Sequence, residues 1–501
     1  MDKLNNRPRK TRNCRSPNEL FKRLRKDFAR SIIHVNCTYY LKARLYLSLN
    51  LRFMANLKNN HFNYNIYNDI YIEASWLYEQ HLGFLESPLY QWANLEPFEI
   101  RLNNFLDALI NHDGLIDDFC LEHAFDGDIG DLFTAVSVLA KRKGLPAIKI
   151  LLNDTSLNDL AMRTAIIDAV NYSLSEDDLI CLVNELVDFG NPVAIEMAAK
   201  IASFHQLDFS DVLTLYLKQL DKDGDLDSHE LLLHASLTAL TPALDKNTLS
   251  VDDLTFFASL IEKKLTDEVL QIIAITLLKA KYYEPIKDRT NQLSNYSWLI
   301  LPISLLGNLS AKSFLLDLLV EDAPEQTKEA LIALGLIGSS DTISTLIHYL
   351  ATEDFAEKAS IALQLITGAD LYEDAFIPDE IDPDELFPDE LARYEKGEPV
   401  YPEGEEPGIK VHRISQDEYI WQQWLENNSS KFSSTNRYRF GRVISLPSLL
   451  EALKKPDTPI FIRNLIVDEI ALQYGIELKI DKKMFVNAQL QVIDQALLDH
   501  S

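Results

Sequence analysis

The sequence is poor in the residues that interrupt regular structure and in those that cross-link it. Its 501 residues include only 16 Gly, 19 Pro and 4 Cys, whereas 47% are hydrophobic. So little glycine and proline favours helices, because these two residues are the least compatible with a helix interior. The four cysteines are scattered and form no CxxC pair. Their placement argues against a disulfide framework and against a zinc site built from cysteine pairs.

Other patterns are missing as well. The chain has no uncharged apolar run of the length that a membrane-spanning helix needs, about 18 residues or more. It contains no HExxH, GxSxG, GxGxxG or Walker-type motif, so protease, hydrolase and nucleotide-binding activities lack support from the residues. We therefore expect no catalytic residues, no cofactor and no membrane span.

One loop has the start of a calcium-binding pattern. Asp221, Asp223 and Asp225 stand at the first three ligand positions of an EF-hand loop. Leu226 then replaces the glycine that the sharp turn needs, and Leu232 replaces the bidentate glutamate at the last position. We interpret the loop as a solvated connection between helices and expect no metal site.

The net charge of −28 is divided very unevenly. Residues 1–53 hold 14 Lys and Arg against three acidic residues, a balance of +11, so the remaining residues carry −39. The first segment is either disordered or lies upstream of a true start at Met54; a basic arm and an organellar transit peptide are the alternatives. Because the rest of the chain is so acidic, we expect no nucleic-acid partner.

The segment 329–368 is the most informative part of the chain. The pattern Ala-Leu-x-Leu-Ile at 333–337 returns at 362–366, an offset of 29 residues, and Leu306–Ser310 matches Leu334–Gly338 at an offset of 28. Two amphipathic helices fit into each period. A period of about 30 residues with two helices is typical of an α-solenoid.

This stretch resembles the HEAT-type repeats of phycobilin lyases. We predict an all-α fold, an α-solenoid of HEAT-like helix pairs with an aromatic N-terminal cap and a C-terminal helical module. The predicted organisation is a basic segment at 1–53, a helical cap at 69–126, HEAT-like repeats at 127–368, an acidic proline-rich belt or linker at 369–412, and the helical module at 413–501.

The belt is expected to lack a long regular helix, because Pro-Asp-Glu recurs at 378, 383 and 388 and each proline removes a hydrogen-bond donor. Two features follow it. Trp421 and Trp424 lie one helical turn apart, which places both indoles on one face and is more typical of a core than of a binding site. Arg437, Arg439 and Arg442 alternate with aromatic residues, and they either hold the belt by ion pairs or form a recognition edge for an acidic partner.

The C-terminal residues carry a second resemblance. In their order, Trp421-x-x-Trp424, Phe432, Arg437-Tyr438-x-x-Gly441-Arg442 and Leu449-Leu450 look like a family of bacterial HEAT-repeat proteins encoded in type VI secretion gene clusters. The family has no established catalytic residues. The resemblance implies a cytoplasmic accessory protein, an adaptor or assembly factor that binds secretion-system components or effectors.

The predicted function is thus a non-enzymatic protein-binding scaffold that uses the concave face of its helices. The alternative from another class is a HEAT-repeat enzyme or chromophore lyase with an unrecognised pocket. That alternative needs a cofactor-sized pocket lined by polar groups that face one another, and the sequence nominates none.

Overall fold

The computed structural model describes residues 55–86, 91–112, 115–154, 157–320, 322–378, 381, 383, 386–401 and 407–500. The predictions for residues 1–53 and Met54 fall outside these residues. The described chain is mostly helical, as the sequence predicts. It divides into two compact units: the smaller contains the described residues of 55–65 and 372–413, and the larger comprises Ile66–Leu371 and Ile414–Ser501.

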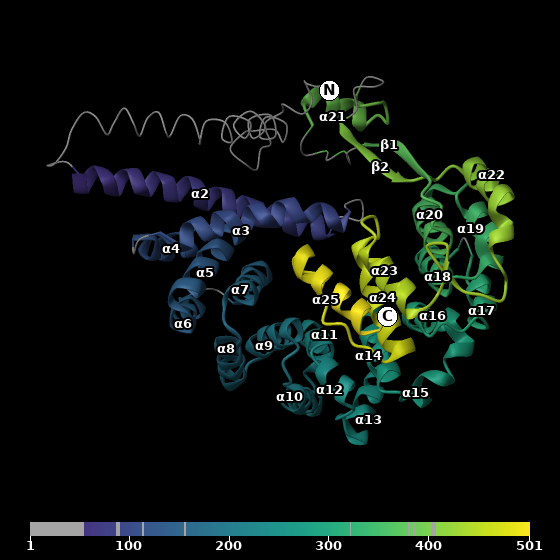
Figure 1. The fold of residues 1–501 in the computed structure, drawn as a ribbon, viewed down its shortest axis with the longest axis horizontal. Helices are drawn as coiled ribbons and strands as arrows, with labels where there is room; N and C mark the ends of the chain where they lie inside the picture. Colours follow the sequence, from purple (N-terminus) through teal and green to yellow (C-terminus); the bar gives the residue numbers. More distant parts are fainter. Residues whose placement is uncertain are drawn as a thin grey trace. The chain divides into compact units, whose positions relative to one another are not determined.

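The first part of the chain consists of helices (Figure 1). They are α2 (Ala55–Glu86), the 3-10 helix η1 (Trp92–Leu95), α3 (Glu96–Ile110), α4 (Leu115–Asp126), α5 (Ile129–Lys143), α6 (Leu145–Asp154), α7 (Leu160–Ser173), α8 (Glu176–Phe189), α9 (Pro192–His205), α10 (Ser210–Asp223), α11 (Glu230–Thr238), α12 (Thr241–Lys246), α13 (Val251–Ser259), α14 (Asp267–Lys279), α15 (Glu284–Lys287), α16 (Ile300–Leu305), α17 (Ala311–Asp317), α18 (Pro324–Ile337), α19 (Ile343–Tyr349) and α20 (Glu353–Thr367).

The remaining elements include short strands. They are β1 (Tyr372–Pro378), α21 (Pro388–Tyr394), β2 (Gly408–Ile414), α22 (Glu418–Asn428), β3 (Tyr438–Arg439), β4 (Arg442–Val443), α23 (Leu446–Lys454), α24 (Ile460–Tyr474) and α25 (Val486–Asp499). Among the described residues the strands form two sheets of two strands each, β1 with β2 and β3 with β4.

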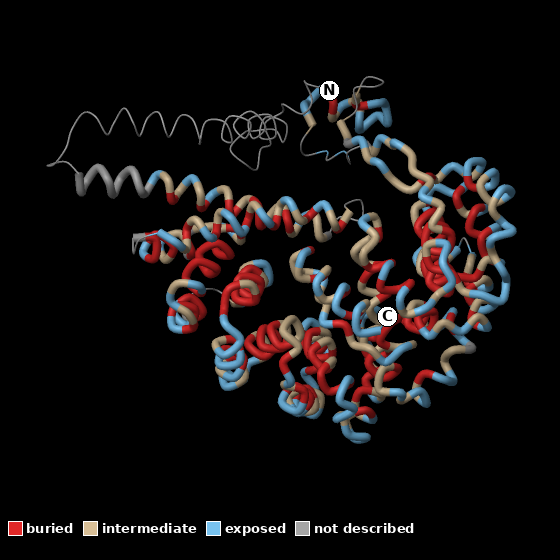
Figure 2. Tube along the Cα trace, viewed as in Figure 1, coloured by how far each residue is buried: buried red, intermediate tan, exposed pale blue. Residues whose placement is uncertain are grey.

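The helices of the larger unit pack in two rows. In the inner row α5, α7, α9, α11, α14, α16, α18 and α20 each pack on the next. The outer helices α6, α8, α10, α13, α17 and α19 each pack on a helix of the inner row. Figure 2 shows that buried residues concentrate on the inner row, whereas the outer helices turn a broad exposed side to solvent. Single helices of this length cannot bury their apolar stripes, so the pairing of the rows supplies the core.

Side-chain caps set the starts of several of these helices. Ser175 and Ser250 act as N-caps: each side chain accepts a hydrogen bond from the backbone N–H three residues later. Thr266 also stands at an N-cap position, but its side chain makes no cap bond. Its backbone N–H and its hydroxyl instead donate to Glu230, which links α14 to the start of α11.

The repeat found in the sequence corresponds to the ends of three inner helices. The offset of 29 matches α18 to α20 but is one residue short of the structural equivalence, because the glycines after these helices, Gly338 at φ +74° and Gly368 at φ +56°, are 30 residues apart. The offset of 28 is three residues short, because Gly307 follows the end of α16 at φ +73° whereas Gly335, its match at that offset, lies inside α18. The structurally equivalent residues are Gly307, Gly338 and Gly368, since each provides the left-handed conformation after a helix.

The C-terminal segment lies against the inner row and is part of the larger unit. Helix α24 packs on α14 and α16, and α25 packs on α3 and η1 (Figure 1). Residues of α16, α18 and α20 share one apolar core with residues of α23, α24 and α25. The region predicted as a C-terminal module is therefore integrated into the helical rows, because its apolar faces and theirs cover one another.

Buried polar contacts hold the end of this segment in place. The Lys483 ammonium lies 2.8 Å from both carboxylate oxygens of Asp168, which also accepts from Tyr78 at 2.8 Å. The Phe485 ring stacks on Tyr172, with 4.4 Å between the ring centroids. The backbone N–H of Val486 donates to a Glu99 carboxylate oxygen at 2.8 Å. The inner side of α2, α3 and α7 is thus contacted by the chain's own C-terminal segment, which occupies there part of the face predicted from the sequence to bind a partner.

Two further expectations need correction. Helix α2 begins at Ala55, well before the predicted start at Asp69, because a helix once nucleated extends at little cost through residues that carry no apolar periodicity. The belt is not all loop, since its two flanks pair as β1 and β2. Arg413 pairs with Glu373 at 2.9 Å, and the His412 ring stacks on Tyr372. These cross-strand contacts stabilise the pairing of β1 with β2.

We expect Lys483→Met to lower the free energy of unfolding by about 3 kcal/mol, because it leaves the Asp168 carboxylate buried without its cation. Urea denaturation measures the change. Lys482→Met is the matched control, since Lys482 is exposed next to it and has no ion-pair partner among the described residues. Equal effects of the two substitutions would contradict the account of the inner face.

Candidate functional site

A β-hairpin docks on the C-terminal ends of two neighbouring inner helices. In this hairpin β3 and β4 pair antiparallel, with Tyr438 opposite Val443. The Tyr438 N–H donates to the Gly338 carbonyl at 2.8 Å, and the Phe440 N–H donates to the Leu365 carbonyl at 2.7 Å. The backbone N–H groups of the hairpin thus donate hydrogen bonds to carbonyls at the ends of α18 and α20. These carbonyls have no partner within their own helices.

The glycine after α18 allows this close approach. A Cβ at Gly338 would lie 2.3 Å from the Tyr438 carbonyl oxygen, far inside van der Waals contact. A Cβ at Gly368 would meet Phe440 in the same way, at 2.5 Å. The two glycines therefore end their helices and also leave room for the hairpin.

Arg439 is buried completely beneath the hairpin. Its guanidinium donates to the carbonyls of Gly335 at 2.8 Å and Leu336 at 2.6 Å, and to a carboxylate oxygen of Glu469 at 2.9 Å. The side chains of Arg439 and Glu469 are both 0% exposed. A cation at this position is favourable because the carbonyl end of a helix carries partial negative charge.

Arg437 binds the same carboxylate from the side nearer to solvent. It donates to the other oxygen of Glu469 at 2.9 Å and to the Ile337 carbonyl, also at 2.9 Å. It donates further to Gln473 at 3.0 Å and to the Leu336 carbonyl at 3.4 Å. Burial lowers the pKa of this guanidinium, although the Glu469 carboxylate opposes the shift. It remains a cation at neutral pH, as arginine does in proteins.

We call Arg437, Arg439, Glu469 and Gln473 the arginine cluster. Gln473 completes it, because its amide donates to Glu469 at 2.9 Å and to the Leu305 carbonyl at the end of α16 at 2.7 Å. The cluster thereby joins α16, α18 and α24 to the hairpin. It holds two guanidinium groups and one carboxylate, so it carries a formal excess of one positive charge within a chain of net charge −28.

The sequence left two interpretations of these arginines, ion pairs with the acidic belt or a recognition edge for an acidic partner, and for Arg437 and Arg439 the carboxylate bound is Glu469 rather than one of the belt. Arg437 and Arg439 direct most of their donors to Glu469, to Gln473 and to helix carbonyls rather than to the belt, although the Nε of Arg439 has no partner among the described residues. Arg442 is exposed at the bend after Gly441, whose φ is +76°. Its backbone belongs to β4, and its side chain has no hydrogen-bond or ion-pair partner within the part of the chain that the structure describes.

The two tryptophans belong to the packing of α22. Trp421 is fully buried and donates its indole N–H to the Ser415 carbonyl at 2.7 Å. Trp424 is half-buried, with its ring centroid 6.2 Å from that of Trp421 in an edge-to-face arrangement. The Phe432 ring contacts Trp424 on one side and Tyr438 of the hairpin on the other. The interpretation as core residues is confirmed for Trp421, and neither indole lies in the arginine cluster.

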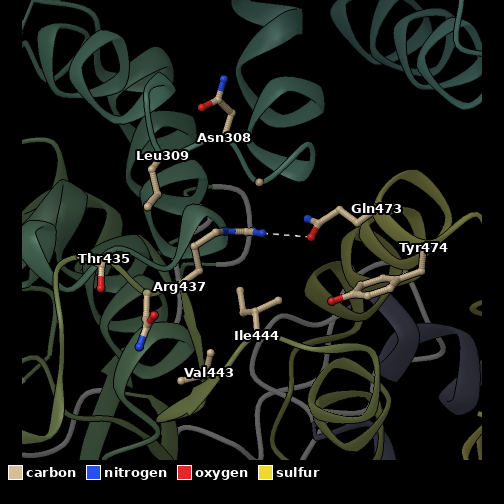
Figure 3. A pocket seen from close by; sticks show the side chains of 10 residues that line it. Asn308, Leu309, Thr435, Arg437, Val443, Ile444, Gln473 and Tyr474 are labelled. Atoms are coloured by element: carbon tan, nitrogen blue, oxygen red, sulfur yellow. Dashed lines mark hydrogen bonds between the residues drawn. The ribbon is translucent and has the colours of Figure 1, made fainter.

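A shallow pocket of about 380 Å³ opens beside Arg437. It is lined by residues that follow α16, by the hairpin and its preceding turn, and by the end of α24: Gly307, Asn308, Leu309, Thr435, Asn436, Arg437, Val443, Ile444, Gln473 and Tyr474. Figure 3 shows the Arg437 side chain lying across the middle of the pocket toward Gln473. Its volume is at the lower end of the range for small-ligand pockets.

Glu469, Gln473 and Asn308 were not singled out from the sequence. Glu469 lies in a helix, where single acidic residues are ordinary. Only its contact with two arginines, 30 and 32 residues earlier in the chain, gives it a role. No local pattern reports such a contact. The structure also identifies no cluster of three or more His, Cys, Asp or Glu suited to a metal ion among the residues it describes.

We expect Glu469→Gln to lower the free energy of unfolding by about 3–5 kcal/mol, because it leaves two guanidinium groups buried without a carboxylate. The exposed Glu451 on α23 provides the control, and Glu451→Gln is expected to stay within about 0.5 kcal/mol of the wild type. Urea titrations followed by tryptophan fluorescence report both changes. A Glu469→Gln protein as stable as the control would rule out the arginine cluster as a structural linkage.

Comparison with known proteins leaves the site to be judged on its geometry. No family model matches the chain. No match was found among curated proteins or among solved structures. In the part of the chain that the structure describes, no helix has the length and apolar character to cross a membrane.

Proposed function

We propose that this chain is a non-enzymatic protein-binding scaffold, built as an α-solenoid of HEAT-like repeats, that serves as a cytoplasmic accessory factor in type VI secretion. The solenoid part of the proposal rests on the two rows of helices and on the equivalent glycines Gly307, Gly338 and Gly368. Each glycine ends one inner helix, and they recur at a spacing close to the repeat length found in the sequence.

Exposed apolar side chains on the outer row are the observation that carries the binding function. Phe189 on α8 is 59% exposed, Leu215 on α10 is 70% exposed, and Val251 at the start of α13 is 70% exposed. We call these three residues the outer apolar set. A partner that covers large exposed apolar side chains gains free energy from removing them from water.

The outer apolar set lies on helices that are linked to one another. Tyr216 of α10 donates to the Gly190 carbonyl at the end of α8 at 3.1 Å, and Lys218 of α10 pairs with Asp253 of α13 at 2.6 Å. These contacts fix the three helices side by side without burying the outer apolar set. A partner that packs on all three helices would bury these side chains, whereas the C-terminal segment of the chain already contacts α3 and, on the inner row, α7, α14 and α16.

The link to type VI secretion rests on the resemblance of the C-terminal residues. Trp421-x-x-Trp424 and Arg437-Tyr438-x-x-Gly441-Arg442 are the motifs that carry it. In the structure they form the α22 packing and the hairpin that closes the inner row. A structural role of this kind is a reason for a family of scaffolds to retain these residues in this order.

The test is affinity purification from a bacterium that encodes a type VI secretion cluster, with wild type and the double variant Phe189→Glu, Leu215→Glu compared. We expect secretion components or effectors to be enriched with the wild type and reduced about tenfold or more with the variant, because two apolar anchors are replaced by charges. Quantitative mass spectrometry measures the enrichment.

The matched control places the same charges on the same helices at exposed polar positions. Asn184→Glu with Gln219→Glu should recover partners as the wild type does. Equal loss in both double variants would assign the effect to charge rather than to the outer apolar set. Enrichment of no secretion protein by the wild type would overturn the type VI assignment.

A further inference from the structure

The pocket beside Arg437 has one polar wall and one apolar wall. Leu309, Val443 and Ile444 supply the apolar side, and they come from the turn after α16 and from the hairpin. The polar side consists of Asn308, Asn436, Tyr474 and the arginine itself. Figure 3 shows the Arg437 guanidinium extending toward Gln473, with Ile444 and Tyr474 on the same side of the pocket. All lie within the larger unit.

The polar side is rich in hydrogen-bond donors. The side-chain oxygen of Asn308 accepts hydrogen bonds from the backbone N–H and the hydroxyl of Ser310. The amide N–H groups of Asn308 therefore point away from Ser310. Asn436 makes no side-chain hydrogen bond among the described residues and is exposed. Burial raises the pKa of the Tyr474 phenol, with the Glu469 carboxylate adding to the rise, so its O–H stays protonated at neutral pH.

Arg437 retains one donor for the pocket. A guanidinium has five N–H bonds. The contacts to Ile337, Leu336, Glu469 and Gln473 use four of them, which leaves one N–H on Nη1 without a partner among the described residues. Nη1 passes directly over Gly307, where a Cβ would lie 2.1 Å away, so glycine is needed for the guanidinium to reach this position.

The charge of the pocket has one sign. No lining residue carries a carboxylate, and the side chain of Arg437 is 14% exposed. Both Glu469 oxygens are already engaged by the two arginines and Gln473. The negative ends of the α18 and α24 dipoles both lie near the cluster and reduce its excess charge. Arg437 is the one formally charged residue among those that line the pocket.

We propose that this pocket binds the terminal carboxylate of a peptide whose last side chain is apolar. The guanidinium N–H and the amide and phenol donors take the carboxylate, and Leu309, Val443 and Ile444 take the side chain. The inference rests on the proposed protein-binding function for the source of the peptide. The pocket itself is a separate site from the outer apolar set.

The experiment is a ligand-observed NMR titration of the full chain with small probes. N-acetyl-leucine presents a terminal carboxylate beside an apolar side chain, and N-acetyl-leucine amide presents the same side chain without the charge. N-acetyl-glutamate α-amide tests a side-chain carboxylate, and inorganic phosphate tests a free anion. We expect saturable binding of N-acetyl-leucine with a dissociation constant on the order of 1 mM and none of the amide at that concentration.

The variants change the charge of the pocket without touching the arginine cluster. Asn308→Asp and Asn436→Asp each place a carboxylate in the lining, and the first of them keeps an oxygen that can accept from Ser310. Each is expected to weaken the binding of N-acetyl-leucine about tenfold. Asn191→Asp is the matched control, because Asn191 is also exposed and its side-chain oxygen also accepts a backbone N–H, at the start of α9.

The outcomes decide the proposal independently of any partner. Equal binding of N-acetyl-leucine by the wild type, Asn308→Asp and Asn191→Asp would overturn it, and so would equal binding of the amide. Tighter binding of the glutamate probe or of phosphate would overturn the assignment to a peptide terminus and leave a general anion site. Failure of the secretion-component purification would leave this result unchanged, since the titration needs no partner protein.

Discussion

Two guanidinium groups that share one buried carboxylate are the interaction on which the rest of the structure depends. Glu469 belongs to α24, Arg437 and Arg439 belong to the hairpin, and the arginines also bind the last carbonyls of α18. Each partner alone would be costly to bury, because a charge without a counter-charge loses far more hydration than it regains. The hairpin, α18 and α24 are therefore ordered together, and the position of α24 decides where the rest of the C-terminal segment goes.

That position has a consequence for how the chain can bind other proteins. From α24 the chain runs through Glu477, which pairs with Lys279 of α14 at 3.1 Å, to Lys483 on Asp168 and on to α25 beside α3. The C-terminal segment thus spans from the late helices of the inner row to the earliest ones. A row of helix pairs contacts only its neighbours, and this segment adds contacts between its distant parts. The proposed binding surfaces, the outer apolar set and the pocket beside Arg437, both lie outside these contacts.

The helical character, the helix pairs and the repeat could be predicted from the sequence because they depend on local signals. Apolar periodicity, the N-caps Ser175 and Ser250, and the glycines that end α18 and α20 are all visible within a few residues. The partner of the arginines could not be predicted in this way. The belt offered many carboxylates nearby, whereas Glu469 lies 30 residues beyond Arg439 and is selected by the packing of α24 on α16, which no local pattern encodes. The pairing of β1 with β2 was missed for the same reason. The two strands are separated in the sequence by the proline-rich stretch, and no local pattern shows that they pair.

Native-state hydrogen exchange tests the central claim, that the C-terminal segment is part of the core of the larger unit, most directly. Exchange resolved by mass spectrometry compares peptides from α24 and α25 with peptides from α14, α18 and α20. Our account predicts that their most protected amides exchange together and respond equally to added urea, as one cooperative unit. Faster exchange of the α24 and α25 peptides, with no change in the protection of α14 and α18, would contradict it.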